Sequence, residues 1–316
     1  MAQISRKPIT KRLSSVLLVV TATACWGTSG IFINLIIRQS GLSAVGLAFW
    51  RDLTTSLLLL AGILIIKPSL LVIKKKDLPW LIGMGAISIG IFHVLWNKAV
   101  VLIGAALATV VQCNAPIFVT IMAWFLFGER ITTRKIIAMT LAAVGTGLVS
   151  GISSVGEWKI VPLGLLIALG SAITYGSLSL FGKKLSGDYN AWTIMFYIFA
   201  FGTLTLFAVQ LGSPDPWPAN SNFLPLFVGF VLISTIAGFT LYTTSLKYLP
   251  ASIASITATS EIFFASILAY IFLQEKMDLW QIIGSVLIIT GVVLVSLVKN
   301  NSSGEKETDV GVNPGD

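Results

Sequence analysis

The chain alternates between long apolar runs and short polar connections from residue 14 to residue 298. Each run approaches the roughly 20 apolar residues that a helix needs to cross a bilayer. The connections contain Pro, Gly and Asn, which break helices. The predicted spans are residues 14–37, 43–66, 79–102, 105–127, 133–151, 161–182, 190–211, 223–246, 251–273 and 279–298. The pattern therefore predicts an all-α integral membrane protein with about ten transmembrane helices.

The composition of the chain agrees with this prediction. Only 11% of the 316 residues are charged and 55% are hydrophobic, whereas a soluble domain carries about 25% charged residues. The net charge of +8 does not indicate nucleic-acid binding, because the basic residues lie in short segments between the apolar runs. The last segment, residues 299–316, is polar and lacks aromatic residues, so it is predicted to be a disordered tail.

Lysine and arginine residues gather in alternate connections. One side of the predicted topology carries Arg6, Lys7, Lys11, Arg12, Lys67, Lys74, Lys75, Lys76, Arg130, Arg134, Lys135, Lys183, Lys184 and Lys247. The other side carries only Arg38, Lys159 and Lys276. Because short cytoplasmic connections are enriched in Lys and Arg, both termini and the tail are predicted to be cytoplasmic, with the protein crossing the cell membrane many times.

The two halves of the chain resemble each other. Residues 106–150 align without a gap with residues 252–296, and the same register matches Trp96 with Tyr242. Trp26-Gly27 matches Tyr175-Gly176 after a small gap. One register that persists through helices and connections indicates an internal repeat.

The repeat predicts two units of five spans each, residues 1–151 and 152–298. Because five is an odd number, the two units must cross the membrane in opposite senses. Inverted repeats are typical of secondary transporters, which bind substrate near the membrane midplane where the halves meet.

Short motifs connect the chain with a known family. The first span contains CWGTSG and the second contains FWR, while CNAPIF with FGER and TSEIFF with LQEK lie near the ends of the two halves. In this order, over residues 14–298, the chain resembles the EamA-like branch of the drug/metabolite transporter superfamily. The resemblance implies a ten-helix inverted-repeat carrier of small metabolites, often an exporter of amino acids or related compounds. One departure is that the family's second copy commonly reads Glu-Pro, whereas Ile262 follows Glu261 here, so a proline kink is not expected at that point.

Two charged residues lie side by side in the second predicted span. A charge at the bilayer centre costs about 2.5–3.5 kcal/mol even on insertion scales, so Arg51 and Asp52 must face protein or water. Helical spacing groups them with Thr55 on one face. Adjacent helical positions differ by about 100°, so the two need not bridge each other. The alternatives are a structural role between helices, or a cavity in which Arg51 contacts substrate and Asp52 supports it.

Glu261 lies deep in the apolar run 251–273, with Ser260 beside it and no opposite charge nearby in sequence. One alternative is a protonated carboxyl group that joins helices by hydrogen bonds. The other is a group that exchanges protons or binds the ammonium of a substrate, because ionised carboxylates inside membranes mark functional sites. Glu261 is therefore the candidate for proton coupling.

Aromatic and polar side chains share helix faces in several other spans. His93, Trp96 and Asn97 lie on one face of the third span, and Tyr242 and Thr243 occupy the repeat-related face of the eighth. The alternatives are lipid-interface anchoring for the two aromatic side chains and simple packing for His93. Pro116 predicts a kink that frees a carbonyl near Asn114. The predicted substrate-binding residues are Trp26, Arg51, His93, Trp96, Asn97, Asn114, Tyr175, Tyr242, Thr243, Ser260 and Glu261.

These observations predict a secondary active transporter. The sequence has one histidine and contains neither a nucleotide-binding loop nor a metal-ligand cluster, so no cofactor or metal is expected. Both charge signs with aromatic residues suit an amino acid or another zwitterion, exported in exchange for protons. The alternative substrate is a quaternary ammonium or other organic cation, held by cation–π attraction. A channel or transmembrane binding protein is a further alternative, as is an intramembrane enzyme using Asp52, His93 and Glu261. The expected partners are a small-molecule substrate and the lipid bilayer, without nucleic acid, and the expected state is a monomer or homodimer.

Overall fold

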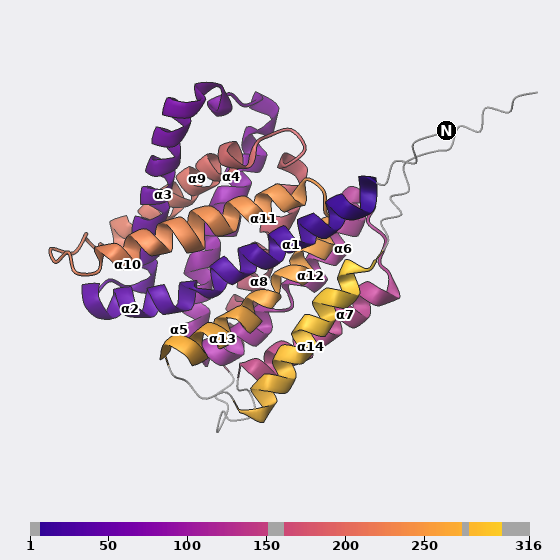
Figure 1. The fold of residues 1–316 in the computed structure, drawn as a ribbon. Helices are drawn as coiled ribbons and strands as arrows, with labels where there is room; N and C mark the ends of the chain where they lie inside the picture. Colours follow the sequence, from indigo (N-terminus) through magenta and orange to yellow (C-terminus); the bar gives the residue numbers. More distant parts are fainter. Residues whose placement is uncertain (1–6, 151–160, 274–277, 299–316) are drawn as a thin grey trace, which may run out of the picture.

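The computed structural model describes residues 7–150, 161–273 and 278–298, and all regular structure in these ranges is helical (Figure 1). The α-helices are α1 (Lys7–Gly27), α2 (Ser29–Ser40), α3 (Ala44–Ile66), α4 (Leu78–Gly85), α5 (Phe92–Gln112), α6 (Ala115–Phe127), α7 (Thr133–Val149), α8 (Pro162–Leu185), α9 (Ala191–Gly212), α10 (Leu224–Gly229), α11 (Gly238–Leu246), α12 (Ala251–Ala258), α13 (Ser260–Leu273) and α14 (Leu279–Ser296). Two π-helices, η3 (Ala86–Ile91) and η4 (Phe230–Ala237), and two short 3₁₀ turns, η1 (Pro68–Leu71) and η2 (Lys75–Asp77), complete the chain.

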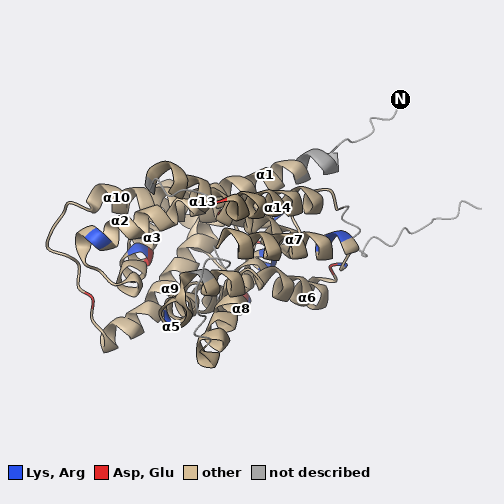
Figure 2. Cartoon of the chain, turned by 90° about the horizontal axis from the view of Figure 1, so that it is seen from below, with Lys and Arg blue, Asp and Glu red and all other residues tan. Residues whose placement is uncertain are grey.

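Nine helical segments of the described ranges are long and apolar enough to cross a membrane. The remaining predicted span, residues 133–151, corresponds to α7, which has 17 residues. Figure 2 shows that Lys, Arg, Asp and Glu are sparse along the bodies of the helices. The prediction of an all-α integral membrane protein is therefore confirmed, while the predicted tail lies outside the described residues.

Connections that the sequence analysis placed on the same side of the membrane contact each other. Ser43 N, at the start of α3, donates to Asp215 Oδ2 at 2.7 Å. On the opposite side, Lys74 Nζ donates to Asp188 Oδ1 at 2.9 Å. Each contact joins two connections that the predicted spans place on the same side of the membrane. The contacts do not tell which side is cytoplasmic.

Three of the long apolar segments are interrupted near the middle of the molecule. α1 gives way to α2 at Thr28, α5 to α6 at Cys113–Asn114, and α12 to α13 at Thr259. At each point a side chain bonds a carbonyl of the preceding turn: Thr28 Oγ1 donates to Cys25 O, Asn114 Nδ2 to Val111 O, and Thr259 Oγ1 to Ile256 O, at 2.6, 3.1 and 2.7 Å. Such local bonds compete with the helical ladder. The kink predicted from Pro116 is present, because Pro116 lies at the start of α6.

Helices α7 and α14 pack side by side along their length (Figure 1). A Cβ atom built on Gly145 would lie 2.6 Å from Gly284 O, and one built on Gly291 would lie 2.9 Å from Ala138 O. Close helix packing therefore requires glycine at these positions. A Cβ on Gly147 would meet no atom of the described residues within 4 Å, so packing does not require glycine at that position.

The start of α12 is held by a carboxylate from the connection between α6 and α7. Glu129 accepts hydrogen bonds from Ala251 N at 2.6 Å and from the Ser252 hydroxyl, and it forms an ion pair with Lys135 at 3.3 Å. A carboxylate at a helix N-terminus satisfies free N–H groups and complements the helix dipole. This contact fixes α12, which leads directly to Thr259 and Glu261.

Candidate functional site

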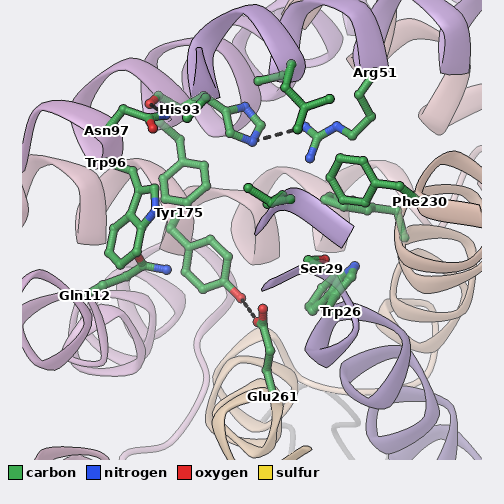
Figure 3. A pocket seen from close by; sticks show the side chains of 16 residues that line it. Trp26, Ser29, Arg51, His93, Trp96, Asn97, Gln112, Tyr175, Phe230 and Glu261 are labelled. Carbon is green, nitrogen blue, oxygen red and sulfur yellow. Dashed lines mark hydrogen bonds between the residues drawn. The ribbon is translucent and has the colours of Figure 1, made fainter. Parts of the chain in front are cut away.

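A cavity of about 260 Å³ lies between helices of both halves of the chain (Figure 3). Its walls come from α1, α2, α3, α5, α8, η4, α11 and α13. The lining includes Trp26, Ser29, Arg51, His93, Trp96, Asn97, Gln112, Tyr175, Phe230 and Glu261. The predicted polar faces of several distant spans therefore meet at one site.

Arg51 and His93 form one wall of this cavity, and Asp52, which is not among its lining residues, pairs with Arg51. Arg51 Nε and Nη2 donate to Asp52 Oδ1 at 2.8 and 2.7 Å, and Asp52 is fully buried. The adjacent residues thus do bridge, although their positions on the helix do not require it, because the long arginine side chain folds back. The guanidinium also lies 5.5 Å from the centre of the Phe230 ring. The ion pair with Asp52 and the cation–π contact with Phe230 hold the buried guanidinium in place.

The hydrogen bond between Arg51 and His93 fixes how the imidazole is protonated. Arg51 Nη2 lies 3.0 Å from His93 Nε2. A guanidinium has no acceptor, so His93 Nε2 must accept, and the imidazole is neutral in this arrangement. Nη1 of Arg51 is engaged by none of the residues in the described ranges. It therefore remains able to donate to an anion in the cavity.

Glu261 lies on the opposite side of the cavity, in the first turn of α13 (Figure 3). The Tyr175 hydroxyl, from α8, donates to Glu261 Oε2 at 3.2 Å. The Tyr175 ring packs against Phe92 with centroids 5.3 Å apart, and Phe92 stacks on Trp96 at 6.4 Å. A single carboxylate is thus held beside a row of aromatic rings.

Seven of the eleven predicted binding residues line this cavity: Trp26, Arg51, His93, Trp96, Asn97, Tyr175 and Glu261. Trp26 is positioned by rings of the second half, with centroids 5.0 Å from both Phe239 and Tyr242. The position of Asn97 is fixed by its own helix, because Nδ2 donates to His93 O at 2.7 Å.

The other four, Asn114, Tyr242, Thr243 and Ser260, do not line it. The Tyr242 hydroxyl bonds Ser179 Oγ at 2.6 Å, and Ser260 Oγ bonds Thr23 Oγ1 at 2.8 Å, while Asn114 bonds carbonyls of α5. Thr243 is buried. The polar groups of Tyr242, Ser260 and Asn114 are therefore already hydrogen-bonded within the protein.

The sequence analysis missed several lining residues. Gln112 is a neutral polar residue inside an apolar run, and its position before Cys113 and Asn114 was a usable signal. Ser29 falls inside the CWGTSG motif of the first span, and that position was a usable signal. Phe230 carries no signal, because it is one apolar residue among many; it reaches the cavity from the first position of η4.

A second cavity, of about 350 Å³, adjoins the first. The two share Trp26, Ser29, Trp96, Gln112, Tyr175 and Glu261. Glu261 and Tyr175 therefore lie between two chambers. Among the described residues, a cationic side chain, Arg51, lines the first chamber and none lines the second.

The arrangement of helices around one polar cavity can be compared with known proteins. The model of the EamA-like transporter family matches residues 13–151 and 162–297. The chain belongs to the EamA-like transporter family. The family is described as one of transporters, and the relatives reported below are named as transporters or exporters.

Three relatives illustrate this family. An uncharacterized transporter of Archaeoglobus fulgidus is 27% identical over 280 residues, which cover 89% of this chain and 97% of the relative. The uncharacterized inner membrane transporter YicL of Salmonella typhimurium is 26% identical, covering 88% and 94%. The pseudopaline exporter CntI of Pseudomonas aeruginosa is 23% identical, covering 90% and 97%.

A solved crystal structure shares the fold. Its TM-score against this chain is 0.76, with 19% sequence identity, and the match covers 90% of this chain and 97% of the other. This likeness shows the shared fold, while the family match and the apolar helices identify the chain as a multi-pass membrane transporter of small molecules.

Proposed function

We propose that this transporter carries an amino acid or a related zwitterion out of the cell in exchange for protons. The observation that carries the proposal is the cavity between Arg51 on one wall and Glu261 on the other. A cavity of about 260 Å³ suits a small metabolite. One relative is named an exporter of pseudopaline, which is compatible with outward movement of a small metabolite.

Each end of such a substrate has a partner in the cavity. Arg51 Nη1 donates to the carboxylate, while Asp52 and His93 keep the guanidinium oriented. The ammonium replaces the Tyr175 hydroxyl as the donor to Glu261. When the substrate leaves, Glu261 takes up a proton instead, because a bare carboxylate in a low-dielectric site is costly. This alternation couples one proton to one substrate.

Two inverted repeats would supply the alternating access that this cycle needs. The register that pairs residues 106–150 with 252–296 also pairs the interruption at Cys113 with that at Thr259. The same register aligns η3 with the last part of η4 in sequence. Matched irregularities at matched positions support the proposed division into residues 1–151 and 152–298.

A second candidate substrate follows from the charges of the cavity. Arg51 is neutralised by Asp52 and His93 is neutral, so ionised Glu261 leaves one negative charge unbalanced. A single organic cation restores neutrality, and Trp26, Trp96 and Tyr175 offer ring faces to a quaternary ammonium. This observation favours a cation such as choline over a zwitterion, although it leaves Arg51 Nη1 without a partner.

A thermal-shift screen of the purified protein tests both candidates, because a ligand that binds the folded state raises the melting temperature. We expect neutral amino acids to raise it in the wild type and to lose most of that effect in Arg51→Lys, which keeps the charge but loses the planar fork. Shifts by choline alone, unaffected by Arg51→Lys, would support the second candidate. Stabilisation by neither class would contradict both.

A further inference from the structure

The second cavity lies where three interrupted helical segments meet. It is bordered by residues on both sides of the breaks, including Gly27 and Ser29, Cys113 and Ala115, and Thr259 and Glu261. Side chains from both halves of the chain therefore line it, and it continues from Glu261 away from Arg51. In transporters, interrupted helices at the middle of the membrane commonly form ligand sites.

The lining of this cavity combines donors, such as the Trp26 indole N–H and the Gln112 amide, with acceptors, and its charged group is a carboxylate. Thr109 Oγ1 donates to Ala105 O at 2.8 Å and Thr259 Oγ1 donates to Ile256 O at 2.7 Å. A hydroxyl has one proton, so both side chains can only accept from a ligand. Glu261 adds a carboxylate, and neither Lys nor Arg lines the cavity.

Gln112 gives an independent indication of a ligand. It lines both cavities, and its Oε1 is buried without a hydrogen-bond partner in the described part of the chain. A buried acceptor without a partner is costly, and rotation of the amide toward the cavity would let a ligand donate to it and remove the cost. Gln112 and Glu261 line the same cavity, and an ammonium group is a donor that either side chain can accept from.

We propose that the second cavity is a subsite for an amine-bearing arm of the substrate, and that it excludes a second carboxylate. The inference rests on the proposed function, in which Arg51 holds the carboxylate in the first cavity. It adds that the preferred substrates are longer than the first cavity and carry an amine at the far end. The Glu261 carboxylate, with neither Lys nor Arg among the described lining residues, attracts such an arm and repels an anionic one.

Three amino acids of similar length test this inference: lysine, norleucine and 2-aminoadipate, whose side chains end in an amine, a methyl group and a carboxylate. Calorimetric binding to the purified full-length protein is measured for each, with alanine as the short reference. Lysine is expected to bind at least about tenfold more tightly than 2-aminoadipate, with norleucine between them. Equal or tighter binding of 2-aminoadipate would overturn the subsite.

Two variants connect the preference to this cavity. Gln112→Met keeps the length of the side chain but removes the acceptor, so it should reduce lysine affinity about fivefold or more and spare norleucine. Gly30→Leu places a side chain in the cavity where a Cβ meets no atom within 4 Å, so it should weaken lysine and norleucine but not alanine. Gly62→Leu is the matched control, because its Cβ also meets no atom and Gly62 lies outside both linings.

The outcomes separate the two proposals. If alanine and norleucine bind but neither Gln112→Met nor Gly30→Leu changes lysine binding, the subsite is wrong and the proposed function stands. If Gly30→Leu does not fold, the Gln112→Met result decides. If none of the amino acids binds the wild type, the proposed function is contradicted and the subsite with it.

Discussion

Arg51 and Asp52 show how a single pair of residues can be tolerated inside an apolar helix. Asp52 is fully buried and Arg51 is 8% exposed, and their bond lengths of 2.7–2.8 Å place the charges in direct contact. Desolvation makes a buried pair weak evidence for stability, but loss of one partner leaves the other charge uncompensated. The pair is therefore best understood as a means of presenting the guanidinium to the cavity.

Replacement of Asp52 by Asn tests this interpretation at the residue scale. Asn keeps an acceptor for Arg51 but removes the counter-charge, which typically costs about 3–5 kcal/mol for a buried pair. We expect a clearly lower melting temperature for Asp52→Asn in detergent.

The matched control for this prediction is Asp188→Asn, which breaks the exposed pair with Lys74. The hydrogen bond and charge of Lys74 lower the pKa of Asp188. Any stabilisation from that pair is therefore present above the ordinary aspartate pKa and is lost as the pH falls. Because solvent screens it, the control should barely change the melting temperature at neutral pH. Equal effects of the two variants would show that burial of Asp52 does not matter.

The sequence predicts the residues of the site better than their contacts. Charged and aromatic residues inside apolar runs were sufficient to find Arg51, His93 and Glu261. The bond between Arg51 and His93 was not predictable, because it depends on how α3 and α5 are placed relative to each other. Tyr242 shows the opposite case, in which a residue predicted to bind substrate does not line the cavity. Its hydroxyl bonds Ser179 instead.

At the scale of elements, the apolar pattern predicts where spans lie and not where they break. Runs of apolar residues continue through Thr28 and Thr259, where the helices break and a hydroxyl bonds a carbonyl of the preceding turn. Threonine is too common in membrane helices for its identity to predict this outcome. Proline has no N–H, so Pro116 alone gave a usable signal.

The packing of α7 on α14 gives a prediction that uses one helix as its own control. Gly145→Ala forces a Cβ against Gly284 O, which is 2.6 Å away, and overpacking of this kind costs about 1–3 kcal/mol. Gly147→Ala adds the same atom to the same helix in open space, where alanine favours the helix by about 0.5–1 kcal/mol. We expect a lower melting temperature for the first variant and an unchanged or higher one for the second. The reverse order would contradict the close contact of α7 and α14.

At the scale of the whole molecule, the two sets of connections define two faces, and the distribution of Lys and Arg predicts which one is cytoplasmic. Lys74 and Asp188 join connections on the basic face, while Ser43 and Asp215 join connections on the other. The contacts between connections are seen in the fold, whereas the orientation of the protein in the membrane is predicted only from the distribution of Lys and Arg. The orientation therefore requires its own test.

Thiol labelling of intact cells tests the orientation. In a background without Cys25 and Cys113, Asn222→Cys should react with an impermeant reagent from outside, and Lys75→Cys should react only after the membrane is opened. Both positions are exposed, so access to the reagent and not burial decides the result. Labelling of Lys75→Cys in intact cells would reject the predicted orientation.

The most direct test of the central claim is pH-driven transport by Glu261→Gln in sealed proteoliposomes. Glutamine preserves the size of the side chain and can still accept from Tyr175, but it cannot gain or lose a proton. With the amino acid selected by the thermal-shift screen, the wild type should accumulate substrate when a pH gradient is imposed. The variant should fold and exchange labelled for unlabelled substrate, yet lose accumulation driven by the gradient. Accumulation at the wild-type level in Glu261→Gln, or a wild type that does not respond to the gradient, would contradict the account.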